Sequence, residues 1–326
     1  MIKVAVIEGG YSKEKAVSLK SAQTVFKNLN RKKYFPTKVF IDEKEWTAYD
    51  SEGKYTIDKN DFSFTKNGTK NTFDVAFIVI HGSPGEDGKL QGYFDLIGIP
   101  YTTPSQMITA LTFEKFHCNQ FLKNFGLNVA EAVLIKKADT INSSSIVEQV
   151  RLPCFVKPTD GGSSFGITKV TEKKDLKKAI HHAFKHGTQV VIEEFIDGRE
   201  LTNGVFKSKE GIKVLPVTEI ITDNEFFDYA AKYNGESIEV TPADIDSTLT
   251  KKIKTLTNHI YDILNLKGIA RIDYIVTTKG SPYIIEINTV PGQSAESIIP
   301  QVAEVEGIGL EELFGEVIST TMDNDI

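Results

Sequence analysis

Alternating hydrophobic and polar positions are clearest toward the C-terminal end of the chain, where two apolar runs flank a short turn. The runs are residues 269–278 and 281–290, and a Lys-Gly pair lies between them. Two such runs with period-two alternation around a turn predict a β-hairpin. Because successive side chains of a strand point to opposite faces, residues two positions apart share a face. Arg271 and Asp273 therefore share one face of the first run, and Glu286 and Asn288 share one face of the second.

These four residues place two carboxylates, an amide oxygen and a guanidinium among apolar neighbours. Buried acids need a partner or a cation, and hard oxygen ligands suit Mg²⁺, which is usually shared with substrate phosphates. The guanidinium would then be available to a developing negative charge. The alternative is a hairpin whose polar face is simply solvated, but an outward face rarely sets such polar pairs beside such apolar neighbours. The pattern therefore favours a Mg²⁺ site.

The N-terminal third of the chain predicts a doubly wound α/β sheet. Strand patterns alternate with a helical pattern, which favours parallel pairing, and ligands bind at the carboxyl ends of such strands. Two polar segments lie at these ends, residues 9–14 (GGYSKE) and 81–88 (HGSPGEDG). The expected elements are strands at 2–10, 35–42 and 74–82 and a helix at 15–29, with a polar stretch at about 50–72.

The remainder of the chain predicts two smaller α+β units. The second block begins with a helix at 108–127 and reaches a strand at 189–195. The third block contains the hairpin and ends in an amphipathic helix at 308–322. We therefore expect three domains, which cover residues 1–104, 105–190 and 191–326.

Composition narrows the classes of protein that remain. The net charge of −6 argues against a nucleic-acid binder, which usually carries a basic excess. No apolar run approaches the roughly 20 residues that span a bilayer, so no membrane partner is expected. The two cysteines, Cys118 and Cys154, offer neither a disulfide framework nor a metal spacing. These features predict a cytoplasmic location, where thiols stay reduced.

A glycine-rich run follows Lys157 at the end of a strand pattern. Residues 160–166 are Asp-Gly-Gly-Ser-Ser-Phe-Gly, and glycines with adjacent hydroxyls let backbone N–H groups gather around phosphates. The run matches neither the G-x-x-x-x-G-K-S/T loop nor the G-x-G-x-x-G dinucleotide fingerprint. A flexible turn between strands would explain it about as well. The preceding lysine and the Mg²⁺-type hairpin favour a nucleotide phosphate site.

Together these motifs resemble those of a known family. The resemblance to ATP-grasp carboxylate–amine ligases rests on Lys157, the loop GGSSFGI, the strand VVIEEF, and the segments RIDY and IIEIN. The resemblance to the D-alanine–D-alanine ligase family within them rests on GGYSKEKAVSL, HGSPGEDGKLQGYFDLIGIPY and DYAAKY…TPA. It extends from Val4 to Gln301 and implies a Rossmann-like N-terminal substrate domain followed by a two-part ATP-grasp fold. It also implies a homodimer, and ATP with two Mg²⁺ ions, or Mn²⁺ as a substitute, as cofactors.

The resemblance implies an ATP-dependent reaction that joins two D-alanine molecules for peptidoglycan. The carboxylate of the first attacks the γ-phosphate to give an acyl phosphate, and the amine of the second attacks the acyl carbon. The alternatives are a ligase for another amino acid pair or one that forms D-alanyl-D-lactate. Ester-forming members often carry a histidine where this chain has Tyr233, so an amine is expected. A regulatory nucleotide-binding protein that has lost catalysis is a weaker alternative. The chain keeps all the residues that the resemblance assigns to catalysis and Mg²⁺ binding, which are Glu14, Arg271, Asp273, Glu286 and Asn288.

The resemblance also implies individual roles. The closing loop would be residues 226–242. The expected Mg²⁺ ligands are Asp273, Glu286 and Asn288. The expected ATP contacts are Lys115, Lys157, Ser164, Glu193, Glu200, Phe226 and Lys232, with Phe155, Phe195 and Ile285 as further apolar walls.

For the amino acid substrates, Glu14 would hold the ammonium of the first D-alanine and form hydrogen bonds with Ser163 and Tyr233. Arg271 and the N–H of Gly292 would stabilise the tetrahedral oxyanion. The other expected substrate contacts are His81 for the first D-alanine, and Ser297 and Ile298 for the second carboxylate. The chain departs from the family pattern at Lys15-Ala16, at Phe165, and at Glu296, where many members have histidine.

Overall fold

The computed structural model describes residues 1–159, 166–222 and 237–323. Its first sheet has seven strands in the order β6-β5-β4-β3-β2-β1-β7. The three strands at one end of this order are parallel, which confirms the predicted α/β sheet. They are β1 (Ile2–Gly9), β2 (Tyr34–Ile41) and β7 (Val75–Ile78), and helix α1 (Lys15–Asn28) connects the first two.

The polar stretch at about 50–72 contributes strands rather than a long loop. Four short antiparallel strands extend the sheet beyond β2: β3 (Trp46–Tyr49), β4 (Lys54–Asp58), β5 (Ser63–Lys66) and β6 (Thr69–Asn71). Aspartate side chains fix the turns, since Asp50 Oδ1 accepts the N–H groups of Glu52 and Gly53. An aromatic cluster around the fully buried Phe62 supplies the core that this polar segment needs.

The predicted helix at 108–127 is two helices. Helix α3 (Gln106–Phe113) ends and α4 (Lys115–Lys123) begins at Glu114, whose backbone is extended (φ −92°, ψ 92°). The N–H of Lys115 donates to the carbonyl of Thr159, 3.0 Å away, instead of continuing the first helix. This long-range bond fixes the break and sets Lys115 beside Thr159, the residue that follows β9. Helix α2 (Lys89–Ile97) precedes both.

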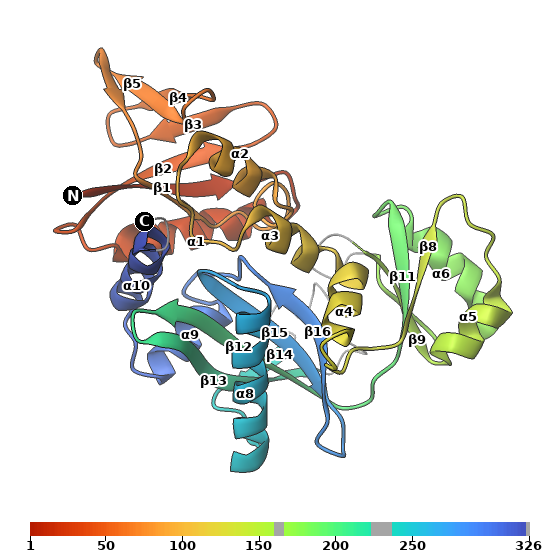
Figure 1. Cartoon of the computed structure of the whole chain (residues 1–326). Helices are drawn as coiled ribbons and strands as arrows, with labels where there is room; N and C mark the ends of the chain where they lie inside the picture. Colours follow the sequence, from red (N-terminus) through yellow and green to blue (C-terminus); the bar gives the residue numbers. More distant parts are fainter. Residues whose placement is uncertain (160–165, 223–236, 324–326) are drawn as a thin grey trace.

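A four-stranded antiparallel sheet lies at one side of the molecule (Figure 1) and has the order β10-β9-β11-β8. Its elements are β8 (Ala132–Lys136), α5 (Ser143–Val150), β9 (Cys154–Pro158), β10 (Thr168–Val170), the short 3-10 helix η1 (Lys173–Asp175), α6 (Leu176–Ala183) and β11 (Gln189–Glu194). The domain boundaries remain predictions, and the one expected between residues 190 and 191 would fall inside β11. Because β11 pairs with β8 and β9 along its length, a division after Glu194 fits this sheet better.

The third sheet has five antiparallel strands in the order β14-β13-β12-β15-β16. Helix α8 packs on one face, and α9 and α10 pack on the other, where their core also includes Val4 and Val25 of the first sheet and helix (Figure 1). This shared core holds the first and third sheets together. The elements are β12 (Arg199–Ser208), β13 (Gly211–Thr222), β14 (Ser237–Val240), α8 (Ser247–Ile263), β15 (Ile269–Val276), β16 (Pro282–Asn288), α9 (Ile298–Val305) and α10 (Leu310–Asp323).

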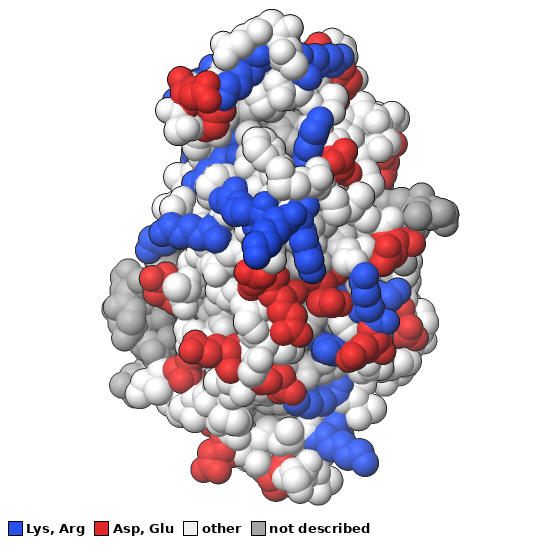
Figure 2. Space-filling model, turned by 90° about the vertical axis from the view of Figure 1, so that its left-hand side faces the viewer, with Lys and Arg blue, Asp and Glu red and all other residues white. Residues whose placement is uncertain are grey.

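Surface charge is mixed on the face that carries the N-terminal strand. Figure 2 shows Lys and Arg side chains gathered directly above a band of Asp and Glu side chains. Positive and negative groups therefore meet on this face. Within the described ranges, no helix combines the length and apolar character needed to cross a membrane.

Candidate active site

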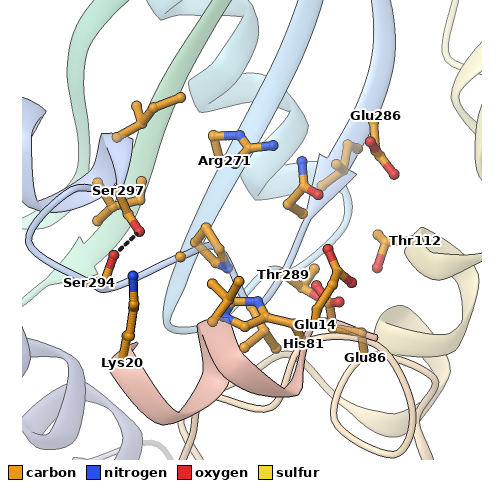
Figure 3. A pocket seen from close by; sticks show the side chains of 18 of the residues that line it. Glu14, Lys20, His81, Glu86, Thr112, Arg271, Glu286, Thr289, Ser294 and Ser297 are labelled. Carbon is orange, nitrogen blue, oxygen red and sulfur yellow. Dashed lines mark hydrogen bonds between the residues drawn. The ribbon is translucent and has the colours of Figure 1, made fainter. Parts of the chain in front are cut away.

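A cavity of about 320 Å³ lies between the first and third sheets. Its walls come from the segment after β1, the segment after β7, the hairpin β15–β16 and the chain that leads into α9 (Figure 3). The loops after β1 and β7 reach it because the carboxyl ends of parallel strands meet at one edge. It gathers eight of the predicted residues: Glu14, His81, Arg271, Glu286, Asn288, Gly292, Ser297 and Ile298.

The predicted hairpin is confirmed, and its ladder sets the four polar residues in opposing pairs. Arg271 faces Asn288, and Asp273 faces Glu286. The buried Asp273 carboxylate accepts hydrogen bonds from Arg271 at 2.9 and 2.8 Å, and from Asn288 Nδ2 at 3.0 Å. Thr202 Oγ1 on the adjacent strand donates to it at 2.6 Å. The guanidinium therefore has a fixed orientation at the cavity wall.

Two lysine–glutamate pairs occupy the side of the hairpin that faces the four-stranded sheet. Lys115 Nζ lies 3.0 Å from Glu286 Oε1, and Lys157 Nζ lies 2.6 Å from Glu193 Oε2. Burial lowers the pKa of Lys115, but the nearby carboxylates, Glu286 above all, outweigh it and raise the pKa above its usual value. The Lys115 ammonium therefore stays charged at neutral pH. The two lysine side chains offer donors suited to phosphates.

Apolar rings lie close to the second pair. The ring centroids of Phe155 and Phe195 are 5.8 Å apart, and Lys169 Nζ lies 4.7 Å from the Phe195 ring centroid. Such a surface can pack against a flat base. The predicted ATP contact Glu200 lies half-buried on β12, in the neighbouring sheet, and does not line the cavity.

Acidic side chains and His81 share the end of the cavity near the first sheet (Figure 3). Ser12 Oγ donates to the carbonyl of His81 and accepts from the N–H of Glu14, which ties the two loops together. The His81 ring lies 3.3 Å from Ser21 Oγ, and that oxygen also accepts the N–H of Gln293. Burial lowers the pKa of His81, so its imidazole is uncharged at neutral pH. In that form it contacts Ser21, which links the segment after β7 to α1 and to Gln293.

Glu86 is a functional candidate that the sequence patterns did not single out, although it belongs to the segment HGSPGEDG. Its Oε2 accepts the N–H of Gly82 at 2.6 Å. Burial and the negative charge of Glu14 raise the pKa of Glu86 to about 8. Glu239 on β14 also lines the cavity, and burial raises its pKa. Glu14 and Glu86 are thus two carboxyl groups at this end of the cavity whose oxygen atoms can accept hydrogen bonds from an ammonium group.

Hydroxyl groups mark the opposite end. Ser297 is the N-cap residue of α9, and its Oγ lies 2.9 Å from Ser294 Oγ. Gly292 is close by, since a Cβ added there would lie 2.5 Å from Ser297 Oγ. Only a glycine leaves this serine undisturbed. Lys20 of α1 also lines this end and was not predicted, because one lysine on a helix with other exposed lysines carries no sequence signal.

Five predicted residues lie outside the part of the chain that the structure describes: Ser163, Ser164, Phe226, Lys232 and Tyr233. Among the described residues, no three His, Cys, Asp or Glu side chains form a metal-binding group. The hairpin offers instead two carboxylates with an amide, Asp273, Glu286 and Asn288.

Comparisons with known proteins agree with this geometry. Residues 3–104 match the family described as D-ala D-ala ligase N-terminus, and residues 121–319 match D-ala D-ala ligase C-terminus. The D-alanine–D-alanine ligase of Parabacteroides distasonis is 46% identical over 322 residues, with 98% of each chain covered. That of Flavobacterium johnsoniae is 45% identical over 323 residues, with 99% of this chain and 100% of the relative covered.

Solved structures give the same result. The VanG D-Ala:D-Ser ligase from Enterococcus faecalis superimposes with a TM-score of 0.87 at 33% identity, covering 98% of this chain and 99% of the other. A D-alanine–D-alanine ligase from Bacillus anthracis complexed with ATP superimposes with a TM-score of 0.81 at 26% identity, covering 100% and 99%. The sequence, the fold and the polar hairpin thus agree, and this chain belongs to the D-alanine–D-alanine ligase family.

Proposed function

We propose that this protein joins two molecules of D-alanine to D-alanyl-D-alanine, at the expense of ATP, for peptidoglycan synthesis. The observation that carries the proposal is the cavity itself, which collects predicted substrate residues from segments as distant as Glu14 and Ser297. Its acidic end suits the ammonium of the first D-alanine, and its hydroxyl end suits the carboxylate of the second. Family membership supports the same reaction.

The carboxylate of the first D-alanine attacks the γ-phosphorus of ATP, and the bond to the bridging oxygen breaks to release ADP. The free amine of the second D-alanine attacks the acyl carbon, and phosphate leaves. Glu14 holds the first ammonium, which fixes the carboxylate beside Arg271. Arg271 and the N–H of Gly292 stabilise the oxyanion, which is the interaction that strengthens most as the reaction proceeds. A closed cavity protects the acyl phosphate from water.

The nucleotide would lie along Lys115 and Lys157, with its base near Phe155 and Phe195. Asp273, Glu286 and Asn288 fit a Mg²⁺ site, because they offer oxygen atoms from two carboxylates and an amide on adjacent strands. Asp273 and Glu286 each lie within ion-pair distance of a cationic side chain, Arg271 and Lys115, so the hairpin already sets both carboxyl groups against positive charge. When bound, two Mg²⁺ ions, or Mn²⁺ in their place, would neutralise the charge on the phosphates.

Other features belong to the same proposal. We expect a homodimeric protein of the cytoplasm, with D-alanine and ATP as its small-molecule partners and without a nucleic-acid or membrane partner. Ser163 and Tyr233, which lie outside the described residues, would form hydrogen bonds with Glu14 in the closed state, and Ser164, Phe226 and Lys232 would contact ATP.

Phosphate release by the purified protein tests the proposal. Incubation with ATP, Mg²⁺ and D-alanine should release phosphate and give the dipeptide by mass spectrometry, whereas L-alanine should give neither. Parallel reactions with D-alanine plus D-serine or D-lactate would reveal a different acceptor. Chelation of Mg²⁺ should stop release, and Glu286→Gln should raise the Mg²⁺ concentration needed for half-maximal rate. ATP binding without phosphate release from any substrate would contradict the proposed function.

A further inference from the structure

Lys20 belongs to the same wall of the cavity as Glu14. Glu14 is the N-cap residue of α1, and Val17 and Lys20 follow it at intervals of three residues, which places all three on one face of the helix. Among the described residues that line the cavity, the Lys and Arg side chains are Lys20 and Arg271. Arg271 is held by Asp273, so Lys20 is the cation near the other end.

The Lys20 side chain is directed toward the end of the cavity where Ser294 and Ser297 lie (Figure 3). In the described part of the chain, its ammonium has no hydrogen-bond partner and no carboxylate within 4.0 Å. The two serine hydroxyls lie 2.9 Å apart. The first N–H groups of α9, from Ile298 onward, point out of the same end. An ammonium, two hydroxyls and a helix N-terminus together suit a carboxylate.

Glu296, an exposed residue directly before Ser297, carries a charge that interacts with that of Lys20. Hydrogen bonds from its own backbone N–H and from the Ser294 hydroxyl, followed by the charge of Lys20, hold the pKa of Glu296 below its usual range. The Glu296 carboxylate is therefore ionised at neutral pH and attracts the Lys20 ammonium across a distance of more than 4.0 Å. It also repels any acceptor with an acidic side chain.

The spacing along α1 matches a dipeptide. Glu14 and Lys20 are six residues apart, which corresponds to about 9 Å along a helix axis. Two extended residues span about 7 Å between their ends. Helix α1 thus carries a carboxylate that can bind an ammonium, that of Glu14, and an ammonium that can bind a carboxylate, that of Lys20. The distance between them matches the distance between the two ends of a bound dipeptide.

We infer that Lys20 binds the carboxylate of the acceptor amino acid. Helix α1 then contacts both ends of the dipeptide product, its ammonium through Glu14 and its carboxylate through Lys20. The inference rests on the proposed function and adds a specificity-determining residue to it. It predicts that the acceptor must carry a free carboxylate close to its amine, with a short uncharged side chain. Glu296 acts as a positioning residue through Lys20.

A competition between two acceptors tests Lys20. The full-length protein receives ATP, Mg²⁺, D-alanine and an excess of D-alaninamide, whose amine can react but which has no carboxylate. Mass spectrometry measures the ratio of D-alanyl-D-alanine to D-alanyl-D-alaninamide. Lys20→Met should lower this ratio about fourfold, as expected for one charge pair at a partly exposed site. Lys20→Arg should keep it within about twofold of the wild-type ratio, because the charge remains.

Lys27→Met is the matched control, since Lys27 is an exposed lysine in the last turn of α1 that does not line the cavity. Its ratio should equal that of the wild type, and Glu296→Gln should raise the ratio. An unchanged ratio in Lys20→Met, or an equal loss of both products, would overturn the inferred role of Lys20 and leave the proposed function standing. Formation of neither product by the wild-type protein would overturn the proposed function and this inference with it.

Discussion

Asp273 and Glu286 lie opposite each other across the β15–β16 ladder, and each carboxylate holds a cation from a different place in the chain. Arg271, two residues earlier on the same strand, pairs with Asp273, and Lys115 at the start of α4 pairs with Glu286. The hairpin therefore connects the substrate cavity to the phosphate side of the site. A change in either pair should affect both stability and catalysis.

Replacement of Arg271 by Ala should lower the free energy of unfolding and abolish turnover. The change leaves the buried Asp273 without two of its hydrogen bonds, and a buried charge that loses its partner costs on the order of 3 kcal/mol. Loss of an oxyanion donor should lower the rate of phosphate release at least about 100-fold. Urea denaturation and phosphate release measure the two effects.

Arg199→Ala provides the control for that prediction. Arg199 also forms a bidentate ion pair, in which Nε and Nη2 each lie 2.6 Å from a carboxylate oxygen of Glu219. The Arg199 side chain, however, is 48% exposed. Because Glu219 is itself buried, the control should cost on the order of 2 kcal/mol, as for a buried acceptor that loses its donor, but it should retain activity since it lies outside the cavity. Equal losses in the two variants would contradict a special role for Arg271.

The pair Lys157–Glu193 should behave as a coupled unit. Both side chains are buried, with 9% and 8% of their surface exposed. Lys157→Met should destabilise the protein by on the order of 3 kcal/mol because the buried Glu193 carboxylate loses its partner. The double variant with Glu193→Gln should recover much of that loss, while the KM for ATP stays high. Additive losses in a double-mutant cycle would argue that the two side chains act independently.

Gly292→Ala should impair binding of the acceptor with little loss of stability. The added Cβ would lie 2.5 Å from Ser297 Oγ and 3.0 Å from Ser297 Cβ, so the serine must move. We expect a KM for the second D-alanine that is raised about tenfold, which corresponds to about 1.4 kcal/mol. Gly309→Ala is the control, because no atom lies within 4 Å of its added Cβ. Unchanged kinetics in Gly292→Ala would place the acceptor away from Ser297.

The hairpin could be predicted because its signal is local. Period-two alternation and a turn are both present within residues 269–290, and the structure has the expected strands. The strands β3–β6 were missed for the opposite reason, since their sequence is polar and their core comes from distant rings such as Phe94. The break at Glu114 was missed because the carbonyl of Thr159, 44 residues after the donor Lys115, determines it.

The residues of the site divide in the same way, into those that a local motif identifies and those that only distant contacts identify. Residues that belong to long motifs, such as Glu14 and Asn288, could be assigned from the sequence. Lys20 and Glu239 could not, because their importance depends on what faces them across the cavity. Glu86 lies within a recognised motif, but its unusual ionisation follows from burial beside Glu14, which only the three-dimensional arrangement reveals.

Glu86 should make the stability of the protein depend on pH between about 4.5 and 8. Burial and the charge of Glu14 raise its pKa from 4.5 to about 8 in the folded protein. In this range the folded chain keeps the proton and the unfolded chain releases it. Stability from this group is therefore complete below pH 4.5 and is lost progressively as the pH rises toward 8.

Glu86→Gln should remove that dependence. Glutamine keeps an oxygen that can accept the N–H of Gly82 but cannot ionise, so the variant should gain stability relative to the wild type as the pH increases. Urea denaturation at pH 5, 6, 7 and 8, in buffer without divalent cations, measures the difference. Glu304→Gln, an exposed acid on α9, should show no such trend. A constant difference between wild type and Glu86→Gln across the range would mean that Glu86 ionises normally, and that the acidic end of the cavity accepts its full negative charge at neutral pH.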